Sequence, residues 1–377
     1  MDLLKDSDVE NVIKKVMNEC LASLNDRTKH IINDKFYGDH NRIKQYIQTD
    51  GSLHFNSYEG VLKYTESSGN QPYSKLIGII QMIELIREIV PSFFNSIGVD
   101  FLGGSGQLVK VVNGYLGQEC EGFLTADISL KQLIEGLRKG WSMVPCNIVK
   151  PESLRKEVLD WGIIAYGFHH IAPENRLDAL EASFSKIKRG GVLLLHDGFI
   201  GSSTIDIMSK IVDEYSVEKH EFPFLKIEDF ERYQSYFVEN HGAKVDKYSI
   251  FDPMVFFGCD LPSLQEDFST YMKNHYYLQL NNQEIFNAFE KILHEYSLKE
   301  FDMKQAVYIK KEEENLTSLS AGLVFNNGSA RKPFAKELYA GTCPDEIKNI
   351  YDKVIDTQEY CVIVPRFATV LRITKNT

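Results

Sequence analysis

The sequence predicts an α/β fold in which a mostly parallel sheet is covered by helices on both faces. Between residues 96 and 200, strand-like and helix-like segments alternate, as they do in successive βαβ units. Two apolar runs, GIIAY at 162–166 and GVLLL at 191–195, are typical of strands that are buried on both faces. With 377 residues, 43% of them hydrophobic, the chain is long enough to bury a sizeable core. These observations favour a Rossmann-like, doubly wound sheet.

Each element of this sheet follows from its local pattern. Apolar or alternating runs that end at turn residues predict strands at 96–103, 121–129, 143–149, 161–168 and 190–198. Apolar residues at helical spacing predict helices at 106–116, 130–140 and 175–188, with a short helix or turn at 153–159. The strand at 190–198 is entered through a Gly-Gly turn.

Residues 1–95 are expected to form a helical region that also serves as a lid. Residues 8–24 carry an amphipathic stripe, and 74–90 repeat it more hydrophobically up to Pro91. The polar, Gly-, Ser- and Pro-containing segments between them predict loops. The segment around Tyr73 is the part expected to lie over a bound ligand.

Beyond residue 200 the pattern predicts a helix at 203–215 and a closing strand at 252–261. The central domain is therefore placed at 96–261, and residues 262–377 are expected to form an α+β extension. That extension contains a helical segment at 281–296 and several strand-like pieces. As an alternative, 359–375 supplies the last hairpin of the main sheet, which would make the tail part of one interrupted domain.

Bulk properties exclude several classes of function. The formal net charge is −11, so the average surface repels phosphate backbones and nucleic acid is not expected as a partner. The six cysteines are scattered without a C-x-x-C pair, which argues against a disulfide framework or a zinc site. The N-terminus lacks the basic start and apolar run of a signal peptide, and no apolar segment approaches membrane-spanning length. A cytoplasmic protein without a membrane partner is expected.

The stretch VDFLGGSGQL, which begins at Val99, combines a strand, a glycine-rich turn and a helix start. Glycines let the backbone approach a ligand closely, and the helix N-terminus offers unpaired N–H groups. Asp127 follows at the end of the next strand, where an acid in a doubly wound sheet binds ribose hydroxyls. The alternatives are a purely structural turn and a helix N-cap at Asp127, with Ser129 competing for that role. The turn residues are Gly103, Gly104 and Gly106, preceded by Asp100.

Residues 96–200 resemble the class I S-adenosylmethionine-dependent methyltransferases. The similar segments are VDFLGGSGQL, TADISLKQLIEGLRKG, VPCNIVKPESL and DWGIIAYGFHHIAPENRLDALEASFSKIKRGGVLLLHDG, of which the last is the most specific. The resemblance implies the class I methyltransferase fold and S-adenosylmethionine as cofactor. It assigns cofactor binding to Asp100, Gly103, Gly104, Gly106, Asp127, Ile128, Cys146, Asn147 and Tyr166.

Two positions depart from the family pattern. Leu102 stands where the family has its first glycine, which would change the shape of the turn and the placement of the cofactor's amino-acid end. Asn147 replaces an Asp and keeps a donor and an acceptor for an adenine edge while losing the charge. A dinucleotide site would need G-x-G-x-x-G and a P-loop would need Gly-Lys-Ser/Thr, and this turn has neither.

Candidate catalytic groups follow the fourth strand. In the similar small-molecule O-methyltransferases a catalytic histidine lies at or beside the position of His169, so His169 is the first candidate for a general base and His170 the second. The alternative is a structural His-His pair. Tyr166 would contact the cofactor or orient the acceptor, or else pack as a core aromatic. His196 and Asp197 end the fifth strand as supporting groups, with Asp197 alternatively capping the next turn.

A metal site is not predicted, because the only neighbouring ligands are the two histidines, whose side chains are expected to point apart. The expected function is S-adenosylmethionine-dependent methylation of a small molecule in specialised-metabolite biosynthesis. Two alternatives stay open. One is an enzyme of the same fold that cyclises the cofactor or transfers its aminocarboxypropyl arm, releasing methylthioadenosine. The other is a non-catalytic binding subunit. A homodimer is also left open.

Overall fold

The computed structural model describes residues 6–47, 76–116, 119–200, 225–251, 254–258, 266, 269–270, 281, 284, 316–319, 322–325, 360–364 and 367–377. The expected helix at 203–215 and the expected lid around Tyr73 lie outside these residues. So do the strand-like piece at 304–311 and nearly all of the expected helix at 281–296.

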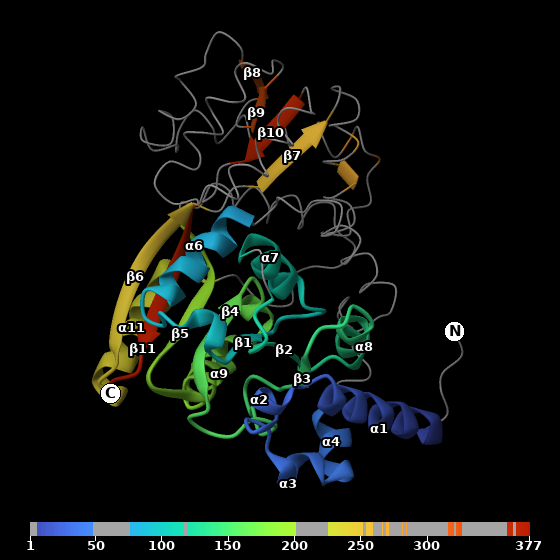
Figure 1. Cartoon of the computed structure of the whole chain (residues 1–377). Coiled ribbons are helices and arrows are strands. Elements are labelled where there is room, and N and C mark those ends of the chain that lie inside the picture. Colours follow the sequence, from blue (N-terminus) through green and yellow to red (C-terminus); the bar gives the residue numbers. More distant parts are fainter. Residues whose placement is uncertain are drawn as a thin grey trace.

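Seven strands form the main sheet, in the order β3-β2-β1-β4-β5-β11-β6. Neighbouring strands from β3 to β5 are parallel, whereas β11 runs antiparallel to both β5 and β6 (Figure 1). The prediction of a mostly parallel, doubly wound sheet is therefore confirmed. The strands are β1 (Gly98–Phe101), β2 (Phe123–Asp127), β3 (Met143–Pro145), β4 (Leu159–Ala165), β5 (Ile187–Ile200), β6 (Lys244–Phe251) and β11 (Phe367–Thr374).

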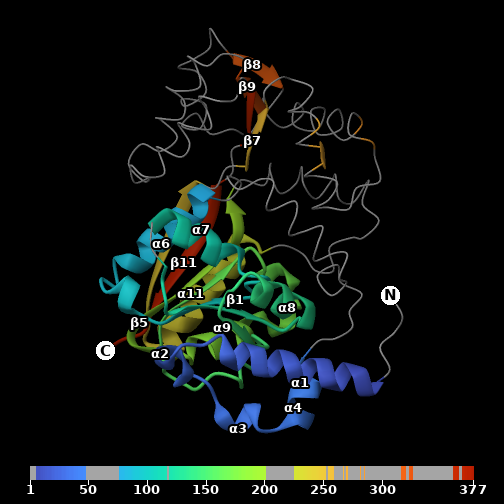
Figure 2. The same ribbon diagram turned by 45° about the vertical axis from the view of Figure 1, so that its right-hand side comes forward.

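Helices cover both faces because the central strands carry apolar side chains on both faces. On β5, Val192 and Leu194 join the apolar cluster that includes α6 (Leu76–Arg87) and α7 (Gln107–Leu116). Leu193 and Leu195 of the same strand point to the other face, into the cluster formed with α9 and α11 (Figure 2). In the described part of the chain, no helix is both long and apolar enough to cross a membrane. The helices of the second face are α9 (Arg176–Phe184) and α11 (Ile227–His241).

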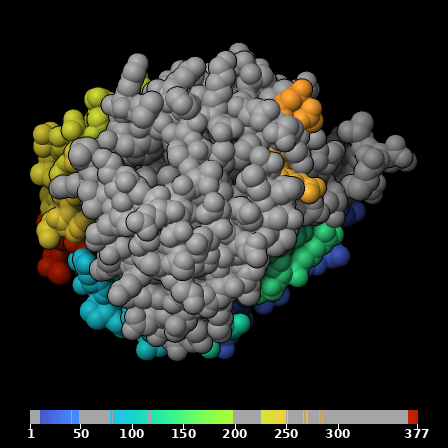
Figure 3. Space-filling model, turned by 90° about the horizontal axis from the view of Figure 1, so that it is seen from above, coloured from blue at the N-terminus to red at the C-terminus, as the bar shows by residue number. Residues whose placement is uncertain are grey.

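The helices of residues 6–47 pack at the β3 end of the sheet. The predicted apolar stripe of α1 (Asp6–Ala22) is buried through Val16 and Met17 in one cluster with Leu133 of α8 and Met143 of β3. In the space-filling view, α8 lies on the opposite side of the molecule from α11 and β6 (Figure 3). Residues 6–47 also contact the loop after β3, because the Tyr46 hydroxyl donates to the Lys150 carbonyl at 2.9 Å and accepts from the Asn147 N–H at 2.7 Å. The other helices of residues 6–47 are α2 (Asp26–Lys29), α3 (Asp34–Tyr37) and α4 (His40–Tyr46), and α8 spans Leu130–Arg138.

The expected role of residues 252–261 as the closing strand is wrong. Within that segment, β7 (Met254–Gly258) pairs with β10 (Tyr360–Val364) in a second, four-stranded sheet of order β7-β10-β9-β8. The main sheet is completed by β6 and β11, and the sequence analysis missed β6. The alternative that 359–375 supplies the last hairpin holds for β11, whereas β10 belongs to the second sheet. The expected domain boundary at residue 261 therefore falls between β7 and its pairing partner β10, which belong to one sheet. The other strands are β8 (Leu316–Leu319) and β9 (Gly322–Phe325).

The ladders of the two sheets share one register. β6 pairs with β11 up to Phe251 opposite Phe367, and β7 pairs with β10 from Met254 opposite Val364, so both ladders keep the same register. The second sheet thus lies beyond the carboxyl end of β6, at the edge where the parallel strands end (Figures 1 and 2).

Arg372 of β11 connects three elements and is expected to contribute strongly to stability. Its side chain is 7% exposed, and its guanidinium pairs with Glu88 beyond α6 and, at 3.0 Å, with Asp246 of β6. We expect Arg372→Met to lower the free energy of unfolding by about 2 kcal/mol, because the two carboxylates and the Leu85 carbonyl lose a charged hydrogen-bond donor.

Urea unfolding followed by circular dichroism measures this loss. The matched control is Arg232→Met, because Arg232 forms an ion pair with Asp229 with its side chain 58% exposed. We expect that exposed pair to contribute less than about 0.5 kcal/mol. Equal losses in the two variants would contradict the structural role of Arg372.

Candidate functional site

The carboxyl ends of β1 and β4 mark the candidate site. The chain leaves these neighbouring strands in opposite directions, to β2 on one side and β5 on the other, and ligands of doubly wound sheets bind at such a switch point. Leu102, directly after β1, has φ of 61°, and Tyr166, directly after β4, has φ of 60°. Residues other than glycine rarely adopt this left-handed backbone conformation, and backbone strain of this kind clusters at functional sites. Among the described residues, Glu157 also adopts it, at the opposite end of β4.

The glycine turn is held flat against the ends of β1 and β2. Gly103 N–H donates to the Ala126 carbonyl at 3.0 Å, and Gly104 N–H donates to Asp127 Oδ2 at 2.9 Å. A Cβ atom at Gly103 would lie 2.7 Å from Asp100 Oδ2, so only glycine allows this approach. Gly106, with φ of 85°, lies under Trp141, whose ring packs on the turn.

Asp127 is bound on both carboxylate oxygens. Besides Gly104, Ser129 N–H donates to Oδ1 at 2.8 Å, and the Ile128 N–H also donates to this carboxylate. Burial raises the pKa of Asp127 to about 6, and these backbone donors oppose the rise. An ionised carboxylate has about four acceptor positions, so this side chain, which is partly exposed, retains room for a donor such as a ribose hydroxyl.

Asp100 and Asp127 form an acidic pair at the ends of neighbouring strands. Asp100 is 3% exposed, and burial followed by the charge of Asp127 raises its pKa well above its usual range. The side chain of Asp100 lies beneath the turn at Gly103, so it acts on the shape of the turn. Of the two acids, Asp127 is therefore the one that the structure leaves accessible to a ligand.

In the loop after β3, the predicted cofactor residues Cys146 and Asn147 make contacts within the protein. Asn147 Oδ1 accepts from Val149 N–H at 3.0 Å, and Asn147 N–H donates to the Tyr46 hydroxyl at 2.7 Å. The Cys146 thiol is buried, which raises its pKa to about 12, and its N–H donates to the Asp127 carbonyl. The side chain of Cys146 therefore faces the interior, and any contact with a ligand is left to its main chain.

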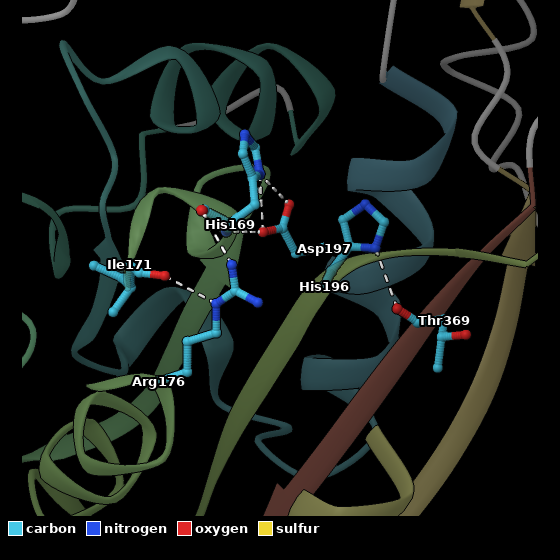
Figure 4. Close-up of polar contacts among 6 residues, drawn as sticks. All are labelled: His169, Ile171, Arg176, His196, Asp197 and Thr369. Atoms are coloured by element: carbon cyan, nitrogen blue, oxygen red, sulfur yellow. Dashed lines mark hydrogen bonds and ion pairs between the residues drawn. The ribbon is translucent and has the colours of Figure 1, made fainter. Parts of the chain in front are cut away.

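His169, just beyond the end of β4, meets Asp197 within β5 (Figure 4). His169 lies in the 3₁₀ turn η3 (Phe168–His170) directly after β4, and its Nδ1 is 3.0 Å from each carboxylate oxygen of Asp197. The His169 N–H also donates to Asp197 Oδ2. Asp197 is 2% exposed and accepts from this loop. The alternative role, capping of the turn after β5, concerns residues outside the described ranges. Because a carboxylate only accepts hydrogen bonds, Nδ1 carries the hydrogen and Nε2 the lone pair.

Arg176 of α9 fixes the loop that presents His169, and the sequence analysis missed it. Its side chain is buried, donating from Nε to the Ile171 carbonyl at 2.9 Å and from one terminal nitrogen to the His169 carbonyl at 3.2 Å (Figure 4). Nothing in the pattern of α9 distinguishes Arg176 from a solvent-exposed helical arginine. Its two contacts hold the η3 loop between α9 and β5.

Three further residues considered for the site, His170, Tyr166 and His196, pack against neighbouring rings. The ring of His170 lies 4.1 Å from that of His169, between centroids, so the expectation that the two side chains point apart is wrong. The ring of Tyr166 packs edge-on against that of His196, with 4.6 Å between centroids. Figure 4 shows His196 Nδ1 facing the Thr369 carbonyl of β11. Within the described ranges, no group of three or more His, Cys, Asp or Glu side chains is placed to hold a metal ion.

The strand order and the antiparallel β11 decide the fold class. The fold is that of the class I methyltransferases. No protein-family model matches the sequence, and no curated protein matches it either. Solved structures of S-adenosylmethionine-dependent methyltransferases match at 11–13% identity with TM-scores of 0.38–0.41, and the fold class rests on the strand order instead.

Three solved structures illustrate these matches. A phosphoethanolamine N-methyltransferase 2 of Haemonchus contortus with S-adenosylhomocysteine is 11% identical at a TM-score of 0.40, and the match covers 85% of this chain and 58% of that one. This chain thus spans little more than half of that protein. A putative methyltransferase of Bacillus halodurans is 12% identical at 0.41, covering 78% and 99%. An S-adenosylmethionine-dependent methyltransferase of Archaeoglobus fulgidus is 13% identical at 0.38, covering 82% and 99%.

The raised pKa of Asp127 predicts a pH dependence of stability. Its pKa rises from 3.8 to about 6 on folding, so the folded state holds this proton more tightly than the unfolded state does. The resulting stabilisation is complete below the unfolded pKa and is lost as the pH rises through about 6. We expect wild type to lose about 2–3 kcal/mol relative to Asp127→Asn between about pH 4 and about pH 8. Urea unfolding of both proteins at the two pH values measures this, and a constant difference would contradict it.

Proposed function

We propose that this protein is an S-adenosylmethionine-dependent methyltransferase in which His169 is the general base. The observation that carries the proposal is the presence of two kinds of group at one edge of the sheet. A glycine turn with Asp127 lies at the ends of β1 and β2, and the His169–Asp197 pair lies just beyond β4 and within β5. A ligand at the switch point lies between them.

The residues around the turn fit an adenosyl group. Asp127 offers acceptor positions at the end of β2, where a ribose would lie, and the backbone donors of Gly104 and Ser129 keep its carboxylate oriented. When bound, S-adenosylmethionine supplies a methyl group on a positively charged sulfur, which is already activated for in-line transfer. The protein is then required to hold the acceptor in line and to exclude water.

His169 would remove the acceptor's proton. Asp197 and Arg176 hold the ring and its loop, so Nε2 is the ring nitrogen that takes up the proton from an acceptor hydroxyl. The Nδ1–H bond to Asp197 stabilises the imidazolium that results. Aligning the acceptor in this way is the contribution of the protein to the reaction.

A small-molecule acceptor from specialised metabolism is part of the same proposal. The net charge of −11 supports it, because an acidic surface disfavours nucleic acid. A cytoplasmic location and a homodimer stay predictions.

Product analysis tests the proposal. The purified protein is incubated with S-adenosylmethionine alone and with a panel of phenols, alcohols and amines, and products are identified by mass spectrometry. S-adenosylhomocysteine that forms only with an acceptor, together with the methylated acceptor, supports methyl transfer. Methylthioadenosine formed without an acceptor overturns it in favour of cyclisation or aminocarboxypropyl transfer. Binding of S-adenosylhomocysteine without turnover of any acceptor favours a non-catalytic subunit.

A further inference from the structure

We propose that Leu102 is a specificity-determining residue for the substituent on the 5′ carbon of the bound nucleoside. This inference rests on the proposed function, because it assumes an adenosyl ligand anchored at Asp127. Leu102 is the residue that departs from the glycine pattern of the turn, and the structure places it between the two halves of the site.

Leu102 carries its side chain on a left-handed backbone. With φ of 61°, Leu102 adopts a conformation that glycine reaches without strain and that a branched residue reaches only at a cost in free energy. Compared with glycine, Leu102 adds an isobutyl group at the carboxyl end of β1.

That isobutyl group spans the gap between the turns after β1 and β4. A Cβ built on Gly167, two residues after β4, would lie 3.3 Å from Leu102 Cβ and 3.7 Å from its Cδ1. Leu102 also packs, partly buried, against the apolar cluster of the α9–α11 face. Its side chain therefore occupies the space between the two turns at the switch point, where a glycine would leave that space open.

The strand order sets the path of the ligand across this position. Asp127 ends β2, Leu102 follows β1, Gly167 follows β4 and Asp197 lies on β5, and these strands are neighbours in that order. Neighbouring strands are about 4.8 Å apart, so β2 and β5 are roughly 14 Å apart. A nucleoside held by its ribose at Asp127 and reacting beside His169 must extend its 5′ substituent over Leu102.

The expected consequence is selection by size at this point. A thioether or sulfonium sulfur is slim and tolerates an apolar neighbour, whereas an amino-acid chain that branches from it needs room and polar partners. Leu102 fills that room, so shortening it is expected to favour ligands that carry the amino-acid chain. Differences of one or two methylene groups in a pocket alter affinity by about 10-fold or more.

Two ligands that differ only in this chain provide the test. S-adenosylhomocysteine and methylthioadenosine share the nucleoside and the sulfur, and isothermal titration gives the dissociation constant of each for wild type, Leu102→Ala and Leu102→Gly. We expect both variants to raise the affinity for S-adenosylhomocysteine relative to methylthioadenosine by about tenfold. The alanine variant removes the bulk but keeps a Cβ at positive φ, so it separates size from backbone strain.

Glu157→Gly is the matched control. Glu157 has φ of 52°, so glycine relieves the same kind of strain there, but at the opposite end of β4. Its affinity ratio should equal that of wild type. Unchanged ratios in both Leu102 variants, or an equal change in Glu157→Gly, overturn the inference while leaving the proposed function intact. Failure of wild type to bind either nucleoside overturns the proposed function, and this inference with it.

Discussion

Replacing His169 by alanine is expected to lower the turnover number by about 10²–10⁴-fold, the usual contribution of a general base. Asp197→Asn should cause a loss of similar order without removing the imidazole. The main-chain N–H of His169 and the ring nitrogen Nδ1 both face the carboxylate of Asp197. An amide offers one acceptor and one donor in its place, so one of these two groups loses its partner and the ring loses its fixed tautomer.

Turnover is measured with the acceptor that the product screen identifies, at saturating S-adenosylmethionine. The pH dependence of the turnover number separates catalysis from structure. Loss of the general base should remove the part of that dependence that the base causes, which a loss of stability alone would not do. His30→Gln is the matched control, since His30 is exposed in the N-terminal region. A His170→Gln variant that loses more activity than His169→Ala would assign the base to His170 and contradict the role of Asp197.

Replacing Asp127 by alanine is expected to weaken the binding of S-adenosylhomocysteine by about 10–150-fold, which corresponds to about 1.5–3 kcal/mol for a charged hydrogen bond. The variant also leaves the Gly104 and Ser129 N–H groups without their acceptor, so its stability should fall. Binding is therefore measured by titration at a temperature where circular dichroism shows the variant folded.

Asp160→Ala controls for the loss of stability. Like Asp127, Asp160 accepts from a backbone donor, the Ile97 N–H, at 2.7 Å. It lies at the start of β4, however, at the edge of the sheet opposite to the turn. Asp160→Ala should lower stability and leave the affinity for S-adenosylhomocysteine unchanged. If Asp127→Ala bound as tightly as wild type, the ribose assignment would be wrong.

Several parts of the site follow from local sequence alone. The apolar runs at 162–166 and 191–195 predict buried strands, because a strand is apolar at successive positions only when helices cover both faces of its sheet. The glycines after Asp100 predict the turn, and the structure gives the reason at Gly103, where a Cβ would lie 2.7 Å from Thr125 Cγ2 of β2. Because parallel strands end at one edge, the pattern also predicts that Asp127 and His169 lie at the same edge of the sheet.

The sequence by itself determined the α/β class, the glycine turn and the acid at Asp127, since periodicity and turn chemistry act over a few residues. Only the tertiary structure decided that β11 enters the sheet between β5 and β6, and that Asp197 and Arg176 hold His169. Every strand edge carries the same backbone donors and acceptors, so a strand's partner depends on packing between segments far apart in the chain. A buried arginine or aspartate likewise resembles an exposed one until its partners are in place.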